Sequence, residues 1–339
     1  MARIWPFALA LLAALPVVAL AQRPPIFRTS WGGPRLRVSA RVATELLPKS
    51  VSVSPDGRRL AVCNFGRAGH DNVFLYDSET LARLGAVHFE GNAVESAWSP
   101  DGRTLYVSNF RHNELEVIDV ESLEVRHSVP VGAHPKTIAL SRDGALIYVA
   151  NYFGRSISVV DARTLREVRR LATGERPRGM AVLRDDTLLS AAFRGEAVRV
   201  FPAGGESEAA DWEVCEFPRD ILPFPDGAGF YMTCSLGYIG FYRREGAGRP
   251  FGIAATGRNP RTIGMTRDGR FLGVANFTSS DITLIDTVAR THRRIEVPGA
   301  EHIVGLAMHP DSSSIRMYAT SWSTSELILL TGSPPPSPD

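Results

Sequence analysis

The stretch SPDGRRLAVCN at residues 54–64 decides the fold, because it returns as SPDGRTLYVSN at residues 99–109. Its turn recurs along the chain at steps of 45, 42, 42, 41, 42 and 43 residues. The seven turns are Asp56-Gly57, Asp101-Gly102, Asp143-Gly144, Asp185-Asp186, Asp226-Gly227, Asp268-Gly269 and Asp311-Ser312. A fixed period of this length indicates a repeat architecture in which each unit packs against its neighbours.

Each repeat has the pattern of a small antiparallel sheet. Asp-Gly between two apolar runs is a strong hairpin signal, since Asp bonds nearby backbone and Gly adopts positive φ. A β-type run precedes the turn, and a second run ends in Asn, as in residues 60–64 and 147–151. A third run closes on Asp77, Asp119, Asp161 or Asp286. We interpret all these Asp residues as turn formers rather than catalytic groups.

The motifs SPDGR at 54–58, LYVSN at 105–109 and IYVANY at 147–152 resemble the YVTN-type repeats of seven-bladed β-propellers. The resemblance spans about residues 41–331 and implies an all-β fold, a seven-bladed β-propeller of four-stranded antiparallel blades. Such repeats occur in YncE-like periplasmic propellers, surface-layer proteins, lactonase propellers, haem d1 domains and amine dehydrogenase heavy chains. A WD40 propeller is disfavoured, because no Gly-His and Trp-Asp pairing recurs at blade spacing. The resemblance therefore predicts the fold and leaves the chemistry open.

Four segments follow from this pattern. We expect a signal peptide at residues 1–21, an extended lead at 22–36, the propeller at 37–331 and a Pro-rich tail at 332–339. Residues 37–46 alternate as a strand does, and we expect them to complete the last blade and close the ring. The tail and residues 23–34 are expected to be flexible or extended.

The N-terminus indicates export. Arg3 precedes an apolar run from Ile4 to Leu20, which ends in Ala19-Leu20-Ala21 before Gln22, the order of a secretory signal. We expect a protein of the periplasm or cell surface, monomeric and without a membrane span after cleavage; an uncleaved anchor is the alternative. The formal net charge of +2 excludes the strong global basic field of typical nucleic-acid binders.

The three cysteines suggest little chemistry. Cys63 and Cys234 end strands in different blades, too far apart to bridge. A Cys215–Cys234 bond is conceivable, but buried thiols acting as small apolar residues are the expected state. No CxxC, CxxCH or clustered His/Cys pattern occurs, so we predict no metal site and no cofactor.

Constant phase allows the repeats to be superposed. Eight residues before each turn Asp lies a position that we call the Pro position, namely Pro48, Ala93, Pro135, Pro177, Pro218, Pro260 and Ile303. The next residues are Lys49, Val94, Lys136, Arg178, Arg219, Arg261 and Val304, five of them basic. The residues after the strand-end Asn position are Phe65, Phe110, Tyr152, Phe193, Ser235, Phe277 and Trp322, six of them aromatic. The family's architecture places both sets on one face, so a basic and aromatic mouth is expected there.

Further polar residues accompany this mouth. Two places after the Pro position lie the acids Glu95 and Asp220, and directly before it lie His134, His302 and Arg176. An acid, a His and several Arg could form an acid–base set that opens a lactone. The alternatives are that the acids are salt-bridge partners, the His are ordinary loop residues, the basic stems cover apolar surface and the aromatics are packing wedges.

Two functional hypotheses follow. The first is a noncatalytic binding or scaffold module of the cell envelope, which holds an anionic small molecule, glycan, peptide, envelope protein or, less favoured, single-stranded nucleic acid. Its binding residues are Lys49, Lys136, Arg176, Arg178, Arg219, Arg261, Phe65, Phe110, Tyr152, Phe193, Phe277 and Trp322. The second is a lactonase-type hydrolase with Glu95, Asp220, His134 and His302 as catalytic candidates. A redox propeller subunit of a periplasmic oxidoreductase ranks last, because no c-haem motif is present.

Blades four, five and seven are irregular. Gly204-Gly205-Glu206 and Asp211-Trp212-Glu213 replace the regular turn within residues 202–217. This segment is a candidate partner-docking site, and a tolerated surface insertion explains it equally well.

Overall fold

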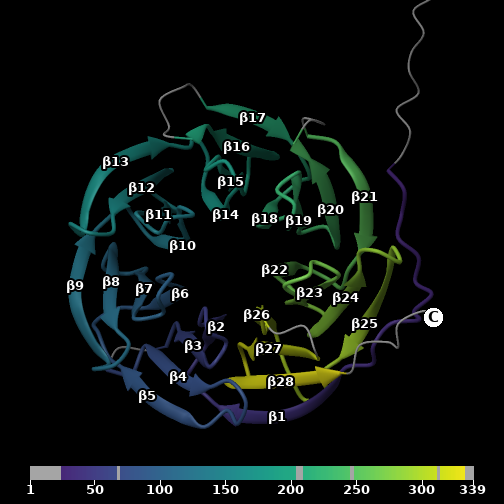
Figure 1. The fold of residues 1–339 in the computed structure, drawn as a ribbon, viewed down its shortest axis with the longest axis horizontal. Coiled ribbons are helices and arrows are strands. Elements are labelled where there is room, and N and C mark those ends of the chain that lie inside the picture. The colour runs from purple at the N-terminus through teal and green to yellow at the C-terminus, as the bar shows by residue number, and fades with distance from the viewer. Residues whose placement is uncertain (1–23, 67–68, 204–208, 245–247, 311–313, 333–339) are drawn as a thin grey trace, which may run out of the picture.

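Seven four-stranded antiparallel sheets surround a common axis (Figure 1). The computed structural model describes residues 24–66, 69–203, 209–244, 248–310 and 314–332. Every regular element in these ranges is a β-strand. The all-β, seven-bladed propeller predicted from the repeats is therefore confirmed.

Blades one to four use consecutive strands, with the first strand of each nearest the axis. Their bounds are β2 (Pro48–Val53), β3 (Arg59–Asn64), β4 (Val73–Asp77), β5 (Arg83–Val87); β6 (Ala93–Trp98), β7 (Thr104–Asn109), β8 (Glu114–Asp119), β9 (Glu124–Pro130); β10 (Pro135–Leu140), β11 (Leu146–Asn151), β12 (Ser156–Asp161), β13 (Arg166–Ala172); β14 (Pro177–Val182), β15 (Leu188–Ala192), β16 (Ala197–Phe201) and β17 (Ala210–Glu213).

Blades five and six follow the same order, and blade seven takes one strand from the N-terminus. Their bounds are β18 (Pro218–Pro223), β19 (Gly229–Cys234), β20 (Tyr238–Arg243), β21 (Pro250–Ala255); β22 (Pro260–Met265), β23 (Phe271–Asn276), β24 (Asp281–Asp286), β25 (Thr291–Glu296); β26 (Ile303–Met308), β27 (Ile315–Ser321), β28 (Glu326–Gly332) and β1 (Arg37–Ala43).

The N-terminal strand closes the ring. β1 pairs antiparallel with β28, from Arg37 opposite Thr331 to Ala43 opposite Glu326, with an irregularity between Val38 and Ala40. The first and last segments of the propeller thus share one sheet, as residues 37–46 predicted. Blade seven gains its outer strand, and the ring has no open sheet edge between blades one and seven.

The Asp-Gly turns have the predicted chemistry. Gly57 has φ of 77°, and its amide donates to the Ser54 carbonyl at 2.9 Å. The Ser54 hydroxyl donates to the Asp56 carboxylate at 2.5 Å, and this bond is the main reason that the pKa of Asp56 lies below its usual value. In blade four Asp186 takes the place of Gly with φ of 61°, a conformation that Asp tolerates better than most residues.

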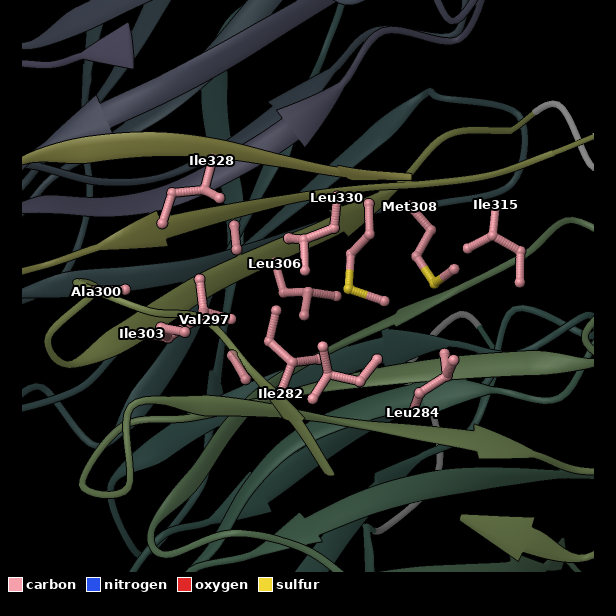
Figure 2. Close-up of a cluster of buried hydrophobic side chains, with 14 of the residues drawn as sticks. Ile282, Leu284, Val297, Ala300, Ile303, Leu306, Met308, Ile315, Ile328 and Leu330 are labelled. Atoms are coloured by element: carbon pink, nitrogen blue, oxygen red, sulfur yellow. The ribbon is translucent and has the colours of Figure 1, made fainter. Parts of the chain in front are cut away.

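The core lies between adjacent blades. Between blades six and seven, Ile282 and Leu284 of β24 lie beside Leu306 of β26 and Ile328 and Leu330 of β28 (Figure 2). All five are at most 2% exposed. Burying each such side chain contributes about 1.5–3 kcal/mol, so contacts between blades stabilise the ring as a whole.

The N-terminal lead is packed onto the propeller. Phe27 donates its amide to the Ile253 carbonyl at 2.8 Å, and its ring is 6% exposed, 4.5 Å from the Phe241 ring. Arg28 then bridges to Thr291 of blade six. Residues 24–34 are thus extended, but they are held by blades five and six, which no local sequence pattern indicated. The expected signal peptide and nearly all of the tail lie outside the described residues.

In blade four, residues 211–213 belong to β17, where Trp212 pairs with Val198 of β16, while Gly204-Gly205-Glu206 lies outside the described residues. In blade five, the expectation for the cysteines was wrong. Cys215 and Cys234 are not thiols: they form a disulfide with Cα atoms 5.9 Å apart. The two residues meet because the loop before β18 returns to the end of β19. Cys63 remains a buried thiol, and burial raises its pKa to about 11.

Candidate functional site at the basic and aromatic mouth

One cross-strand pair recurs in every blade. The first residue of the innermost strand pairs with the last residue of the second strand, in the order Pro48–Asn64, Ala93–Asn109, Pro135–Asn151, Pro177–Ala192, Pro218–Cys234, Pro260–Asn276 and Ile303–Ser321. The next residue on each strand belongs to the predicted basic or aromatic set. The pairing therefore brings both sets to the same face.

A second backbone contact fixes that face. In all seven blades the amide at the aromatic position donates to the carbonyl just before the Pro position, at 2.9–3.3 Å. The pairs are Phe65–Leu47, Phe110–Asn92, Tyr152–His134, Phe193–Arg176, Ser235–Phe217, Phe277–Asn259 and Trp322–His302. Five of these carbonyl-bearing residues have positive φ, namely Leu47, His134, Phe217, Asn259 and His302. The frequent Asn and His there suit this conformation.

The five basic side chains of the predicted ring line one central cavity of about 130 Å³. They are Lys49, Lys136, Arg178, Arg219 and Arg261, and they share the cavity with Glu95 and Asp220. Each is half-buried. Arg219 Nε donates to Ser235 Oγ at 2.7 Å, whereas the buried Nε of Arg261 has no hydrogen-bond partner in the described structure. The cavity thus holds donors that are available to an anion.

Every one of these cations lies near an aromatic ring. The distances from cation to ring centroid are 5.3 Å for Lys49–Trp322, 3.8 Å for Lys136–Tyr152, 4.9 Å for Arg178–Phe193, 4.9 Å for Arg219–Phe193 and 4.1 Å for Arg261–Phe277. Contacts of this kind contribute about 0.5–2 kcal/mol. The aromatics therefore hold the cations in place, and we call the two sets together the mouth.

The aromatic side chains contact one another around the mouth. Phe65 lies 5.7 Å from Phe110 and 5.9 Å from Trp322, while Phe193 lies 6.2 Å from Tyr152 and 5.9 Å from Phe217. The superposition missed Phe217, which is exposed at 42%. It also missed Phe153, whose ring lies 5.0 Å from Tyr152. Phe217 directly precedes Pro218 and Phe153 directly follows Tyr152, so neighbours of the repeat positions were the available signal.

The two acids of the cavity are held differently. The Asp220 carboxylate accepts the Ile221 amide at 3.1 Å and the Ile263 amide at 2.8 Å, and so connects β18 to β22 of the next blade. Burial raises its pKa to about 7. Burial also raises the pKa of Glu95, with the Lys49 charge opposing the shift. No ion pair within 4.0 Å joins either acid to a basic side chain in the described ranges, so the expected salt bridges are not formed.

The basic groups perturb one another. Burial, followed by the charge of Arg178, lowers the pKa of Lys136 to about 7. Burial, followed by the charge of Arg261, lowers the pKa of Lys49 well below its usual value. The same causes lower the pKa of Arg219 and Arg261, which nevertheless stay cationic because guanidinium starts far above neutrality. Positive charge in the cavity therefore lowers the stability of the fold. The charge that remains is available to an anion.

The predicted His residues do not join the acids. His134 and His302 are absent from the cavity lining. His134 contacts Phe110 and Phe153 with ring centroids 4.6 and 4.9 Å apart, and His302 stacks on Phe277 at 4.6 Å. Arg176 also lies outside the cavity, 4.8 Å from the Phe153 ring. The candidate acid–base set is therefore divided. The acids line the cavity, whereas the His residues lie among the aromatic side chains around it, which we call the aromatic rim.

The described ranges contain neither a cluster of metal-ligating side chains nor a membrane-spanning helix. No group of three or more His, Cys, Asp or Glu side chains there is arranged to hold a metal ion. Within the same residues, no helix has the length and apolar character needed to cross a membrane.

Solved structures share the fold. Hydrazine synthase from Kuenenia stuttgartiensis superposes with a TM-score of 0.73 at 21% identity, over 85% of this chain and 96% of that one. The β-propeller domain of Cps50 (Swd1) from Myceliophteria thermophila gives 0.70 at 12% identity, over 88% and 99%. At these identities the likeness extends to the fold alone.

Sequence comparison locates the family signal in the first half of the ring. No curated protein matches the chain in sequence. Residues 35–187, which span β1, blades one to three and the first strand of blade four, match a family model described as YNCE-like beta-propeller. The chain is thus a seven-bladed β-propeller that resembles the YNCE-like β-propellers over residues 35–187, as its repeats predicted.

Proposed function

We propose that this protein is a noncatalytic binding module that holds an anionic ligand at the mouth. The observation that carries the proposal is the convergence of Lys49, Lys136, Arg178, Arg219 and Arg261 on one cavity, with no carboxylate within ion-pair distance among the described residues. The five basic groups around one axis repel one another when charged, which contributes to their lowered pKa values, and packing does not require them. A bound anion removes that repulsion.

The size of the cavity limits what enters it. A cavity of about 150 Å³ in another protein binds benzene, so 130 Å³ suits a small charged group. A phosphate, sulfate or carboxylate group fits this description, and Arg can bind such groups with two parallel hydrogen bonds. The remainder of a larger ligand then rests on the aromatic rim, where Phe65 and Trp322 present rings to it.

Export to the cell envelope is part of the proposal. The apolar run before Gln22 supports it. The Cys215–Cys234 disulfide supports it independently, since disulfides persist in oxidising compartments such as the periplasm. N-terminal sequencing of the protein from a bacterial periplasmic fraction tests this point. A mature N-terminus at Gln22 is expected, and recovery of the full chain in the cytoplasm with free thiols would contradict it.

The binding experiment compares two triple variants. Arg178→Ala/Arg219→Ala/Arg261→Ala removes three cavity charges, and Arg103→Ala/Arg163→Ala/Arg166→Ala removes three exposed charges elsewhere. Sulfate, a nucleoside triphosphate, an oligouronate, an acidic peptide and a single-stranded oligonucleotide are titrated calorimetrically at low and high salt. We expect salt-sensitive binding of at least one probe by the wild type and the control. Binding that survives in the cavity variant, or no binding to any probe, would reject the proposal.

A hydrolase remains the second candidate because of Asp220. Its pKa of about 7 lies in the range that suits general acid–base work. Burial also raises the pKa of Glu95, the second carboxyl group that lines the cavity. If purified protein hydrolyses any member of a lactone panel, Asp220→Asn should abolish that activity while His134→Ala should not. An inactive wild type leaves the binding module as the function.

A further inference from the structure

In blades two and seven, the side chain of the last residue of the second strand hydrogen-bonds the loop before the Pro position, and we call this contact the clamp. In blade two, Asn109 Nδ2 donates to the Glu90 carbonyl at 2.8 Å, and its Oδ1 accepts the Asn92 amide at 3.2 Å. In blade seven, Ser321 Oγ donates to the Glu301 carbonyl at 2.8 Å. These bonds tie the mouth loop to the end of the strand beneath it.

In blades three and six the strand-end Asn donates to side chains of the third strand and packs closely against a glycine of the loop instead. A Cβ on Gly132 would lie 2.4 Å from Asn151 Nδ2, and a Cβ on Gly257 would lie 2.8 Å from Asn276 Cβ. Each glycine lies three residues before its Pro position, as Glu90 does in blade two. In blades two, three and six the strand end thus contacts the position three residues before the Pro position, whereas in blade seven it reaches Glu301, two residues before Ile303.

In blade five the disulfide occupies these two positions. Cys234 is the strand-end residue, paired with Pro218, and Cys215 lies three residues before Pro218. Their sulfur atoms form a covalent bond, with the side chains of Cys215 and Cys234 buried at 5% and 0% exposure. A covalent bond thus replaces the noncovalent contact that blades two, three and six make at these positions.

The residues held by this bond belong to the mouth. Phe217 has φ of 51° and faces Phe193, and its carbonyl accepts the Ser235 amide at 3.3 Å, the longest of the seven equivalent bonds. Ser235 Oγ in turn accepts Arg219 Nε at 2.7 Å. Blade five has Ser235 at its aromatic position, and the ring that Arg219 contacts is Phe193 of blade four, 4.9 Å away.

We propose that the Cys215–Cys234 disulfide is the positioning element that holds Phe217 and Arg219 at the mouth in blade five. Reduction by a dithiol adds two electrons and two protons, yields two thiols and leaves the loop at residues 215–219 without its clamp. This inference rests on the proposed function, since the loss is read partly as weaker anion binding. It assigns a role in the mouth to the one covalent cross-link of the described chain.

The repeat itself supplies a rescue variant. Cys215→Ser/Cys234→Ser removes the bond, whereas Cys215→Gly/Cys234→Asn rebuilds the glycine and asparagine pair of blades three and six. Sulfate affinity and amide hydrogen exchange at residues 216–219 and 235 are measured for both variants and for wild type with and without a dithiol reductant. All proteins carry Cys63→Ser, so that only this pair responds.

We expect the serine variant and the reduced wild type to bind sulfate roughly tenfold more weakly, the scale of one charge-assisted hydrogen bond, with faster exchange confined to the loop. The glycine–asparagine variant should bind as the oxidised wild type does and ignore the reductant. Unchanged loop exchange after reduction would overturn the inference. If no protein binds sulfate or the other anions, the proposed function fails, and the exchange data still decide the role of the disulfide.

Discussion

The ammonium nitrogen of Lys136 lies 3.8 Å from the centroid of the Tyr152 ring. The Phe110 ring lies on a second side at 5.6 Å, and no carboxylate in the described structure lies within ion-pair distance of this lysine. Aromatic faces thus take the place of a counterion. The cation is held where it can contact a ligand, and its burial lowers the stability of the fold.

Lys136→Met should therefore stabilise the protein in a pH-dependent way. Methionine keeps the apolar stem and removes the charge. Since the folded pKa of about 7 is below the ordinary value of 10.5, folded Lys136 loses its proton first as pH rises. The buried charge therefore lowers the free energy of unfolding of the wild type most below pH 7, and this loss disappears towards pH 10 and above.

Urea unfolding at pH 6, 8 and 10 measures this difference. The variant should be more stable than the wild type at pH 6, and the gap should close as pH rises. Lys49 offers no matched control, because its pKa also shifts. A constant gap across this range would mean that packing rather than charge decides the effect.

Anion binding should strengthen as pH falls from 8 to 6. In this window Lys136 gains a proton and Asp220, with a pKa of about 7, loses its negative charge. Both changes make the cavity more positive. We expect about tenfold tighter binding per unit of charge gained. Sulfate is the appropriate probe, because its own charge is constant in this range.

The double variant Lys136→Met/Asp220→Asn isolates these two groups. Its sulfate affinity should change much less between pH 6 and 8 than that of the wild type. Equal pH dependence in both proteins would mean that neither Lys136 nor Asp220 causes the effect.

The fold and the shared face of the mouth could be predicted from the sequence, because both depend on the constant spacing of the repeat positions. Pro135 and Asp143 occupy the same repeat positions as Pro48 and Asp56. Lys136 and Lys49 must therefore occupy equivalent places in their blades, and this requires no knowledge of side-chain contacts. This is why Lys49 and Arg261, far apart in the chain, could be placed at one opening.

Features that depend on distances within or between units could not be derived in this way. The ion pairs expected for Glu95 and Asp220 required knowledge of side-chain separations across the axis. The packing of Phe27 on blade five is a single long-range contact and leaves no periodic signal. The disulfide has a partial signal in the repeat. Cys234 is at the strand-end position and Cys215 is three residues before Pro218, two positions that lie side by side in the structure.

Asp220 should matter more for blade contacts than for charge. Its carboxylate accepts amides from both Ile221 and Ile263. Asp220→Ala leaves two amides without this acceptor and should cost about 2–6 kcal/mol of unfolding free energy, at about 1–3 kcal/mol for each unsatisfied buried donor. Asp220→Asn keeps one acceptor oxygen and should cost roughly half as much. Chemical denaturation of both variants at pH 7 tests the order, and an alanine variant as stable as the asparagine variant would contradict it.

The N-terminal lead, residues 24–34, should stabilise blades five and six mainly through the side chain of Phe27. Phe27 is 6% exposed and contacts Phe241, whereas its neighbour Ile26 is 69% exposed. Phe27→Ala should therefore cost about 3–5 kcal/mol, the usual range for a buried Phe, and Ile26→Ala should cost less than about 0.5 kcal/mol. The two variants are matched in position and backbone pairing, so their difference in urea denaturation reports burial. Similar small effects would show that residues 24–28 contribute nothing to the propeller. A large loss for Phe27→Ala alone would place the lead within the cooperative fold, with the propeller beginning before β1.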